Sequence, residues 1–281
     1  MSKNLFKKRQ VLIVTKHGKS SVIGPAFENA FDLKVNISSV FDTDTLGTFT
    51  GEINRIDDAV STLRKKCEMG MAAENYDLAV CTEASFGPHP SVFFMPAHEE
   101  WMMLKDLKNN LEIIEKELVT DTNFSHQKIE NLNDLEKFAQ KIGFPHAGVI
   151  LKFSNDDSKF FIKDSATWAE LTRNYETYQF THQCDAETDM RAMNNPKRMQ
   201  VIEQLTKKLI AKINSLCPSC NTPGFGVIKA EKGLPCELCG SPTRSTYYFL
   251  KGCQDCDYTE KQMYPHEKTT EDPMYCDYCN P

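Results

Sequence analysis

The chain has 281 residues and a net charge of −6, with 40% hydrophobic and 26% charged residues. This balance is typical of folded globular protein, and the length allows one large domain with a small one or two medium domains. The negative charge disfavours a nucleic-acid binder that relies on a broad basic surface. The apolar runs are too short to cross a membrane, and the basic start lacks the apolar segment of a secretory signal. We therefore expect a cytoplasmic protein without a membrane partner.

Strands and helices alternate along the first part of the chain. The predicted strands cover residues 11–15, 33–40, 76–81, 91–95, 100–105, 112–119, 147–153 and 160–163. The predicted helices cover residues 20–31, 53–75, 132–142, 166–176 and 196–215. Asn109-Asn110 is the expected hairpin turn. This alternation predicts an α/β domain with a mixed sheet over residues 1–215, followed by a zinc-binding module over residues 216–281.

Two of the predicted helices carry clear end signals. Asn195-Pro196 has the asparagine of an N-cap and the proline of a first helical turn, and the helix that it begins leads directly to Cys217. The helix over 132–142 is opened by Asn131 or Asn133 and stopped by Gly143. A helix rather than a flexible linker is therefore expected before the zinc-binding module.

Eight of the eleven cysteines form four C-x-x-C pairs near the end of the chain. These pairs are Cys217/Cys220, Cys236/Cys239, Cys253/Cys256 and Cys276/Cys279. Cytosolic thiols are kept reduced, so the pairs indicate metal binding rather than disulfides. A C-x-x-C turn presents two thiolates and a tetrahedral zinc needs four, so we predict two Zn²⁺ ions. Gly240 suits a turn exit that needs a positive φ.

The spacing alone leaves open which two pairs bind the same ion. The segment from Cys236 to Cys256 resembles a zinc ribbon with a β-hairpin between its turns, which would leave the first and last pairs for the second ion. That nested arrangement is similar to the cysteine-rich module of DnaJ-type chaperones. A sequential arrangement, first pair with second and third with fourth, is the alternative. Sites with four thiolates are closed, so both ions are expected to be structural.

The charge of the module bears on its partners. Residues 217–281 hold six Lys/Arg and nine Asp/Glu, and 6 − 9 gives −3. Bound thiolates add negative charge, and no basic cluster is present to meet a phosphate backbone. A protein partner is therefore expected in preference to nucleic acid.

Two polar loops follow predicted strands, where α/β proteins place their ligands. Lys16, His17 and Lys19 end the first strand and precede a helix whose N-terminus can receive a phosphate. The loop over 42–55 carries Glu52 with Arg55, and its acidic side chains can hold Mg²⁺ or Mn²⁺. An ordinary turn and an ion pair between these two residues explain the same sequence without a ligand.

Two further segments carry candidate site residues. Glu83 follows the strand at 76–81, where a carboxylate can act as a general base or metal ligand, and His89 lies between two prolines. Asp189, Arg191 and Arg198 can clamp an anionic substrate, although helix capping and internal ion pairs explain them equally well. Three other cysteines are interpreted as two core thiols, Cys67 and Cys81, and a candidate nucleophile, Cys184.

The segments TKHGK, TDTLGTFTGEINR, EASFGPHP, ETDMRAMNNPKRM, GLPCELCGSPT and CDYCNP together resemble an uncharacterised bacterial family catalogued as domain of unknown function 6671. The resemblance spans the whole chain and implies the two-part architecture but no activity. Ala84 and Met193 stand where that family's pattern has Gly and His, which weakens any role for a histidine at position 193.

A second resemblance covers residues 11–120, whose order of strands, helix and polar positions is similar to that of inosine triphosphatase-like nucleotide pyrophosphatases. It implies that Lys16 contacts phosphate, that Glu52 and Glu83 hold a metal ion and that Arg55 supports the site. Together with the loops at strand ends, it favours a metal-dependent hydrolase of a nucleotide or other phosphorylated small molecule, with a structural two-zinc module. The alternatives are a non-catalytic zinc-ribbon protein that recognises a protein or RNA partner, and a thiol enzyme that uses Cys184.

Overall fold

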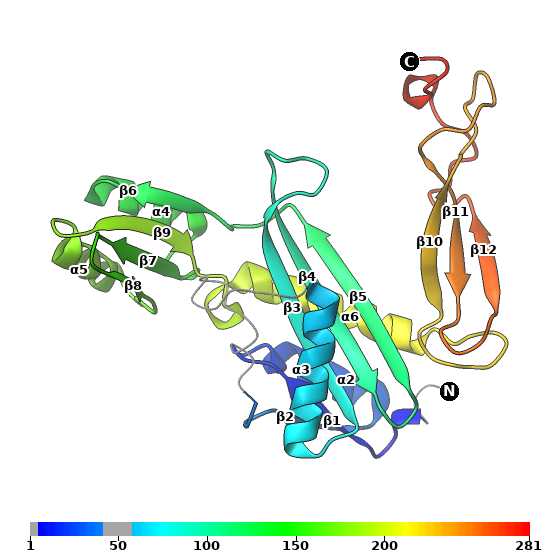
Figure 1. Cartoon of the computed structure of the whole chain (residues 1–281), viewed down its shortest axis with the longest axis horizontal. Coiled ribbons are helices and arrows are strands. Elements are labelled where there is room, and N and C mark those ends of the chain that lie inside the picture. Colours follow the sequence, from blue (N-terminus) through cyan, green and yellow to red (C-terminus); the bar gives the residue numbers. More distant parts are fainter. Residues whose placement is uncertain (1–4, 42–57) are drawn as a thin grey trace. The chain divides into compact units, whose positions relative to one another are not determined.

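The computed structural model describes residues 5–41 and 58–281 (Figure 1). Two compact units are present, one over Phe6–Leu209 and one that joins Leu5 to Ile210–Pro281. The division falls inside helix α6 (Pro196–Asn214), which begins at the expected proline. The fold is mixed α/β, as the sequence predicts, and within the described residues every helix is too short or too polar to traverse a lipid bilayer.

The first unit contains a five-stranded mixed sheet in the order β2-β1-β3-β4-β5. Strands β1 (Gln10–Val14) and β2 (Lys34–Ile37) run parallel, and β3 (Leu78–Pro88) runs parallel to β1 on its other side. The hairpin strands β4 (Pro96–Asp106) and β5 (Leu111–Val119) follow in antiparallel register. Asn110 has φ 50° in the β4–β5 turn, as expected for an Asn-Asn hairpin.

Helices α2 (Ser20–Phe31) and α3 (Ala59–Glu74) cover opposite faces of this sheet (Figure 1). Alternate residues of a strand point to opposite faces. Leu12 and Val14 pack with the buried side of α3, whereas Ile13 lies beside Gly24 of α2. The crossover from β1 to β2 and the crossover from β2 to β3 therefore leave the sheet on different sides, which makes β1 and β3 the point where the winding reverses.

Strand β3 differs from the sequence-based prediction. The strand was expected to end at residue 81 and a separate strand was expected at 91–95, but β3 continues to Pro88 and residues 91–95 form the turn before β4. The reason is pairing: β4 pairs with β3 from Leu78↔Asp106 to Pro88↔Pro96. A long antiparallel partner holds the polar and glycine-containing segment 82–88 extended despite its low strand propensity.

A second, four-stranded antiparallel sheet in the same unit has the order β6-β9-β7-β8. Its strands are β6 (His126–Ile129), β7 (Val149–Ser154), β8 (Lys159–Ile162) and β9 (Gln183–Thr188). Helices α4 (Leu132–Ile142) and α5 (Trp168–Tyr178) pack on it through a shared apolar core. The sequence predicted α4, α5, β7 and β8, but not β6 or β9.

Two cysteines expected as core thiols are joined instead. Cys67 of α3 and Cys81 of β3 form a disulfide, with their Cα atoms 6.1 Å apart, and both are fully buried. The expectation of separate thiols was wrong because it rested on redox compartment alone. The packing of α3 over β3 brings the two side chains together, a contact that local sequence does not reveal.

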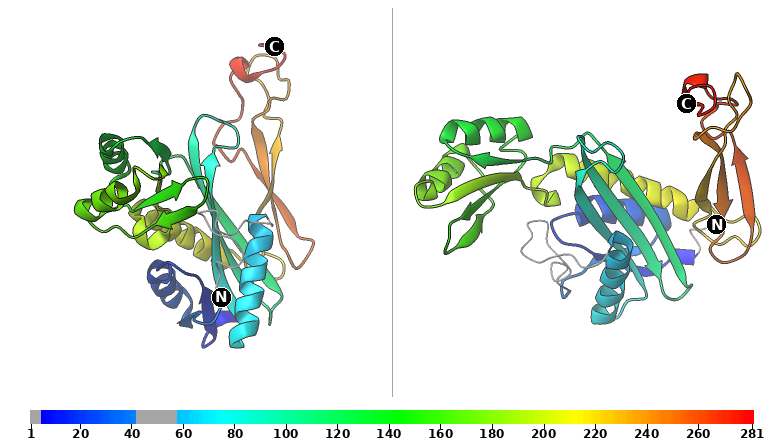
Figure 2. Two further views of the ribbon diagram at one scale, coloured as in Figure 1. Left: turned by 60° about the vertical axis from the view of Figure 1, so that its left-hand side comes forward. Right: turned by 45° about the horizontal axis from the view of Figure 1, so that its top comes forward.

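The C-terminal unit is built around a three-stranded antiparallel sheet, drawn in orange in Figure 2. Its strands are β10 (Gly226–Lys232), β11 (Thr246–Gly252) and β12 (Thr259–Met263). Short 3-10 turns occur at Ala192–Asn194 before α6 and at Pro273–Tyr275 after β12. All five residues of β12 are exposed, so the strands alone bury little apolar surface.

Candidate functional site

The eight paired cysteines gather into two clusters, each of which can hold a metal ion. One consists of Cys217, Cys220, Cys253 and Cys256, and the other of Cys236, Cys239, Cys276 and Cys279. Within each cluster the Sγ atoms all lie within 4.8 Å of one another. No other such cluster of ligand side chains occurs in the part of the chain that the structure describes.

The sulfur positions match tetrahedral coordination. The closest contacts between pairs are 3.7 Å for Cys217–Cys256 and 3.6 Å for Cys220–Cys253. In the second cluster the corresponding distances are 3.9 Å and 3.7 Å. Ligands placed about 2.3 Å from a central ion at the corners of a tetrahedron lie about 3.8 Å apart. Four thiolates fill such a shell, so each cluster is closed to a reacting water.

The pairing of the C-x-x-C turns is interleaved: first with third, and second with fourth. Both the nested and the sequential arrangements expected from the sequence are therefore wrong. The segment after Cys239 does not form a hairpin of its own but a single strand, β11, that pairs with β10 on one side and β12 on the other. Each antiparallel strand carries the chain to the opposite end of the sheet, so alternate turns meet at the same end.

The backbone of the turns is arranged to point both sulfurs inward. Asn221, Gly240 and Asn280 follow the second cysteine of their turns, and each donates its N–H to the carbonyl of the first. Gly240 has φ 71° and Asn221 has φ 60°, so the positive φ expected at Gly240 is confirmed. Glycine and asparagine adopt this left-handed conformation at the least cost.

A separate cluster of buried charges lies on the α2 face of the five-stranded sheet. Glu100 of β4 is completely buried and accepts from Arg198 of α6, with Nε 3.0 Å from one oxygen and Nη2 3.1 Å from the other. His98 Nε2 lies 2.8 Å from the same carboxylate. Lys19 Nζ lies 3.7 Å from it and donates to the Thr82 hydroxyl at 2.7 Å. A single carboxylate thus holds two buried cations and an imidazole.

The surroundings of this cluster shift the pKa values of two members. Burial would raise the pKa of Glu100, but the positive charges of Arg198 and Lys19 outweigh it and hold that pKa well below its usual range. Burial lowers the pKa of Lys19 to about 7, and repulsion by Arg198 adds to the effect while Glu100 offsets only part of it. Lys19 is therefore a lysine that changes charge near neutral pH.

Glu83 lies on the other face of the sheet from Glu100. The register pairs Glu83 with Trp101 and Ala84 with Glu100, and neighbouring residues of a strand point to opposite faces. Glu83 is buried and forms an ion pair with Lys66 of α3. The two expected parts of one site, Lys19 and Glu83, therefore approach the same edge of the sheet from opposite sides.

Lys16 and His17 lie where they were expected, directly after β1 and before α2. Both are half-buried, and His17 and Gly18 have φ values of 65° and 75°. A Cβ on Gly18 would lie only 3.5 Å from Met193 Cβ, so the turn before α6 closes on this loop. Gly18 and Met193, which are 175 residues apart in the sequence, thus meet after the carboxyl end of β1.

Other predicted site residues lie elsewhere or in other roles. His89 belongs to the β3–β4 turn, where its Nδ1 accepts from the N–H of Ser91 at 3.1 Å. Six residues of extended strand separate it from Glu83, about 20 Å at the usual rise. These two residues therefore do not meet. Glu52 and Arg55 lie outside the described residues.

Asp189 and Arg191 form a network with their neighbours before α6. The buried Asp189 carboxylate accepts from Arg191 Nη2 at 2.7 Å and from Asn194 Nδ2 at 2.8 Å. Arg191 also donates to Asp164 at 2.6 Å. Asn195 caps α6, since its Oδ1 accepts from the N–H of Arg198 at 3.1 Å. The N-cap prediction is confirmed, and the described contacts match the capping and ion-pair alternative.

Cys184 does not have the surroundings of a reactive thiol. It is buried in the core of the four-stranded sheet, and burial raises its pKa to about 12. A nucleophilic cysteine needs an accessible thiolate at neutral pH.

Sequence reasoning did not single out Glu100, His98 or Lys66, because nothing local marks a charged residue in a strand as buried.

Comparison with known families gives one finding. A family model described as "Domain of unknown function (DUF6671)" matches residues 66–281, which include the charged residues of β3, β4 and α6 and both cysteine clusters. No curated protein matches the chain.

Proposed function

We propose that this chain, which belongs to the DUF6671 family, is a metal-dependent hydrolase of a nucleotide or other phosphorylated small molecule, with two structural zinc ions. The observation that carries the proposal is that Lys16 follows the carboxyl end of β1, and that Lys19 donates to Thr82, the residue before Glu83 in the neighbouring strand β3. In open α/β sheets, ligands bind at that edge where the winding reverses. In a chain with a net charge of −6, this edge of the sheet carries the buried Lys19 and the half-buried Lys16.

In this proposal the cations bind the phosphate. Lys16 faces the anion near the start of α2, where the partial positive charge of the helix N-terminus favours negative charge. The Lys19 pKa of about 7 means that a phosphate nearby would hold the ammonium form by charge attraction. His17, with its φ of 65°, supplies backbone strain of the kind that collects at functional sites.

Glu83 is proposed to hold Mg²⁺ or Mn²⁺, or to take a proton from the attacking water. Its ion pair with Lys66 would open on metal binding or hold the carboxylate in place for the base role. Arg198 and Arg191 are proposed as positioning residues, because their guanidinium groups are already bonded to Glu100 and Asp189. Arg198 would hold the Glu100 carboxylate in place, and that carboxylate would in turn position Lys19.

The test is turnover of a broad panel of nucleoside triphosphates and phosphoesters with Mg²⁺ or Mn²⁺. Glu83→Gln should lower kcat by about 100-fold or more, the usual effect of losing a general base. The matched control is Glu68→Gln, because Glu68 is a half-exposed residue of α3 bonded to Lys105 at 2.7 Å. If the wild-type protein hydrolyses no member of the panel, the proposal is wrong.

We also propose that the two metal ions are zinc. Four cysteine thiolates in a closed tetrahedral shell are the usual ligand set of structural zinc. Elemental analysis of the purified protein should find two zinc ions per chain and no colour from iron. Iron in place of zinc would contradict the assignment.

A second candidate function is favoured by the second cysteine cluster. Leu238 and Tyr278 lie between the ligand cysteines of their turns and are 75% and 79% exposed. Exposed apolar side chains next to a rigid metal site are typical of protein contact surfaces. If the module serves as a non-catalytic binding module, Leu238→Ser with Tyr278→Ser should abolish a co-purifying protein partner. Glu83→Gln would then leave the function intact.

A further inference from the structure

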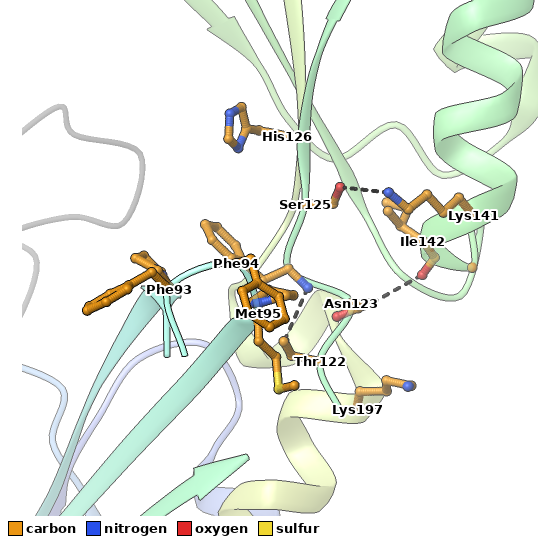
Figure 3. Close-up of a pocket in the computed structure, with 15 residues that line it drawn as sticks. Phe93, Phe94, Met95, Thr122, Asn123, Ser125, His126, Lys141, Ile142 and Lys197 are labelled. Carbon is orange, nitrogen blue, oxygen red and sulfur yellow. Dashed lines mark hydrogen bonds between the residues drawn. The ribbon is translucent and has the colours of Figure 1, made fainter. Parts of the chain in front are cut away.

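A cavity lies where β3 leads into the β3–β4 turn, several residues along the strand from Glu83 (Figure 3). Its volume is about 660 Å³, within the usual range of small-molecule pockets. The β3–β4 turn forms one side. The opposite side comes from residues 122–126 around the start of β6, the end of α4 and the first turn of α6.

The turn side of this cavity is aromatic and exposed. Phe93 is 80% exposed, Phe94 is 90% exposed and Met95 is 36% exposed. Figure 3 shows these three side chains on one side of the pocket, opposite Lys141 and Lys197. Two adjacent phenylalanines in water are unfavourable unless they meet a partner, and an aromatic face offers a stacking surface for a flat ring.

The opposite side is basic. Lys141, Lys197 and His126 line it, and the described residues that line the cavity include neither Asp nor Glu. Lys197 Nζ lies 2.5 Å from Asp121, which is 89% exposed, and surface pairs of this kind contribute little. Lys141 Nζ donates to a neutral group, the Ser125 hydroxyl, at 3.4 Å. In an acidic chain, this local excess of positive charge attracts anions.

The helix ends at the cavity strengthen this preference. The N-terminus of α6, where Lys197 follows Pro196, carries partial positive charge. The C-terminus of α4 carries partial negative charge, but the Ile142 carbonyl already accepts from Asn123 Nδ2 at 3.1 Å. Lys141 in the last turn offsets the rest of that negative charge.

We infer that this cavity binds a small aromatic anion, with its ring against Phe93 and Phe94 and its anionic group between Lys141 and Lys197. The ligand class follows from the two sides together, because an apolar molecule would leave the lysines unmatched and a plain ion would leave the phenylalanines in water. The inference does not depend on the proposed hydrolase activity, because neither Lys16, Lys19 nor Glu83 lines the cavity.

The test is titration calorimetry of the full chain with naphthyl phosphate, compared with naphthol and inorganic phosphate as its two halves. Naphthyl phosphate should bind about tenfold or more tightly than either half, because only the whole molecule meets both sides. Nucleoside monophosphates and aromatic carboxylates, titrated in parallel, distinguish a phosphate from a carboxylate as the preferred anionic group. Equal binding of naphthyl phosphate and naphthol, or no binding of naphthyl phosphate, would overturn the inference.

Variants place the binding in this cavity. Phe94→Ala and Lys197→Gln should each weaken naphthyl phosphate binding about fivefold or more, since each removes one side of the contact. Both side chains are half or more exposed, so the thermal unfolding midpoint should not change. Phe180→Ala and Lys207→Gln are the matched controls, because Phe180 is 91% exposed and Lys207 forms a surface ion pair with its helix neighbour Glu203 away from the cavity. Binding that survives in Phe94→Ala and Lys197→Gln contradicts the assignment.

Discussion

Strand β1 of the α/β unit buries four of its five residues, whereas all five residues of β12 in the C-terminal unit are exposed. The first strand lies under α2 and α3, which supply an apolar core on both faces of the sheet. Strand β12 has no helix over it among the described residues, and the cysteine clusters lie at the ends of its sheet. A small unit that buries too little apolar surface needs another source of stability, and metal ions held by the two cysteine clusters would supply it.

The comparison also applies to charge. In the α/β unit, polar groups such as Glu100 and Asp189 are fully buried and each is matched by side-chain partners. In the C-terminal unit, most ion pairs are exposed, as in Arg244–Asp277. Changes to single residues should therefore be costly in the first unit, while the second should respond mainly to loss of its metal ions.

Removal of the metal ions should unfold residues 217–281 and leave the five-stranded sheet folded. Structural zinc contributes about 10–16 kcal/mol in small zinc-dependent domains, more than this unit can replace by burial. Hydrogen exchange after chelation should show full exchange of the backbone amides of β10 and β11, with those of β3 and β4 still protected. Protection in β11 without metal would contradict the comparison.

The interleaved pairing can be tested by changing two cysteines at a time and measuring the metal content. The double variant Cys217→Ser with Cys253→Ser changes one cluster only, so it should keep one metal ion per chain. Cys217→Ser with Cys236→Ser changes both clusters and should keep none. Elemental analysis distinguishes these outcomes, and the reverse result would indicate a sequential arrangement.

Glu100→Gln should lower the free energy of unfolding by about 3–5 kcal/mol, because it leaves Arg198 and Lys19 buried without their counter-charge. The neighbouring Glu99→Gln is the control: Glu99 is paired with Lys116 at the surface, 3.3 Å away, and should change stability by less than about 1 kcal/mol. Urea unfolding of the α/β unit measures both.

The Glu100 carboxylate also predicts a pH dependence. Its folded pKa lies below its usual range, so its contribution is present above the unfolded pKa of about 4.3 and is lost as the pH falls below it. The wild-type protein should therefore lose stability from about pH 5 downward more steeply than the Gln variant. Parallel acid profiles for the two proteins would contradict this.

Lys19 predicts a second pH dependence, of the same direction but at higher pH. Its folded pKa is about 7, whereas an unfolded lysine keeps its proton to about pH 10.4. Between these values the unfolded state binds more protons, so stability should rise by a few kcal/mol from pH 7 to pH 10. Lys19→Met should remove that rise. Chemical unfolding of both proteins at pH 7 and pH 9.5 gives the comparison.

Asn131→Ala should lower stability by about 1 kcal/mol, the usual effect of losing an N-cap. Asn131 is the N-cap of α4, and its Oδ1 accepts from the N–H of Asp134 in the first turn at 3.0 Å. Asn133→Ala is a matched control, since Asn133 is an exposed residue inside the same helix and alanine is the better helix former. Equal losses in both variants would assign the effect to something other than capping.

Much of the fold could be predicted where the signal is local. The bounds of α2 and α4 agree with the prediction, and the α4 N-cap is one of the two asparagines that the sequence offered. Gly143 ends α4 with φ 93°, as a C-cap glycine should. These features depend on spacing and on caps within a few residues of each other, which a sequence displays directly.

The missed features depend on distant partners. Strand β9 buries Cys184, Ala186 and Thr188 on alternate positions, but these side chains are too small or polar to read as a strand face. The extension of β3 requires β4, and the burial of Glu100 requires Arg198 from the other end of the unit. The cysteine spacing predicted two metal sites but left their pairing open, and the course of β11 selects the interleaved one.

The interleaved cysteines have a consequence for how the chain is made. Translation delivers residues in order, so the ribosome releases Cys217, Cys220, Cys236 and Cys239 before either cluster has its full ligand set. The first ion can be enclosed only once Cys256 has emerged, and the second only after Cys279. With sequential pairing, the first ion would have been captured seventeen residues earlier. During that interval the nascent protein presents four accessible thiols, which makes newly synthesised chains the form most vulnerable to oxidation and to capture of the wrong metal.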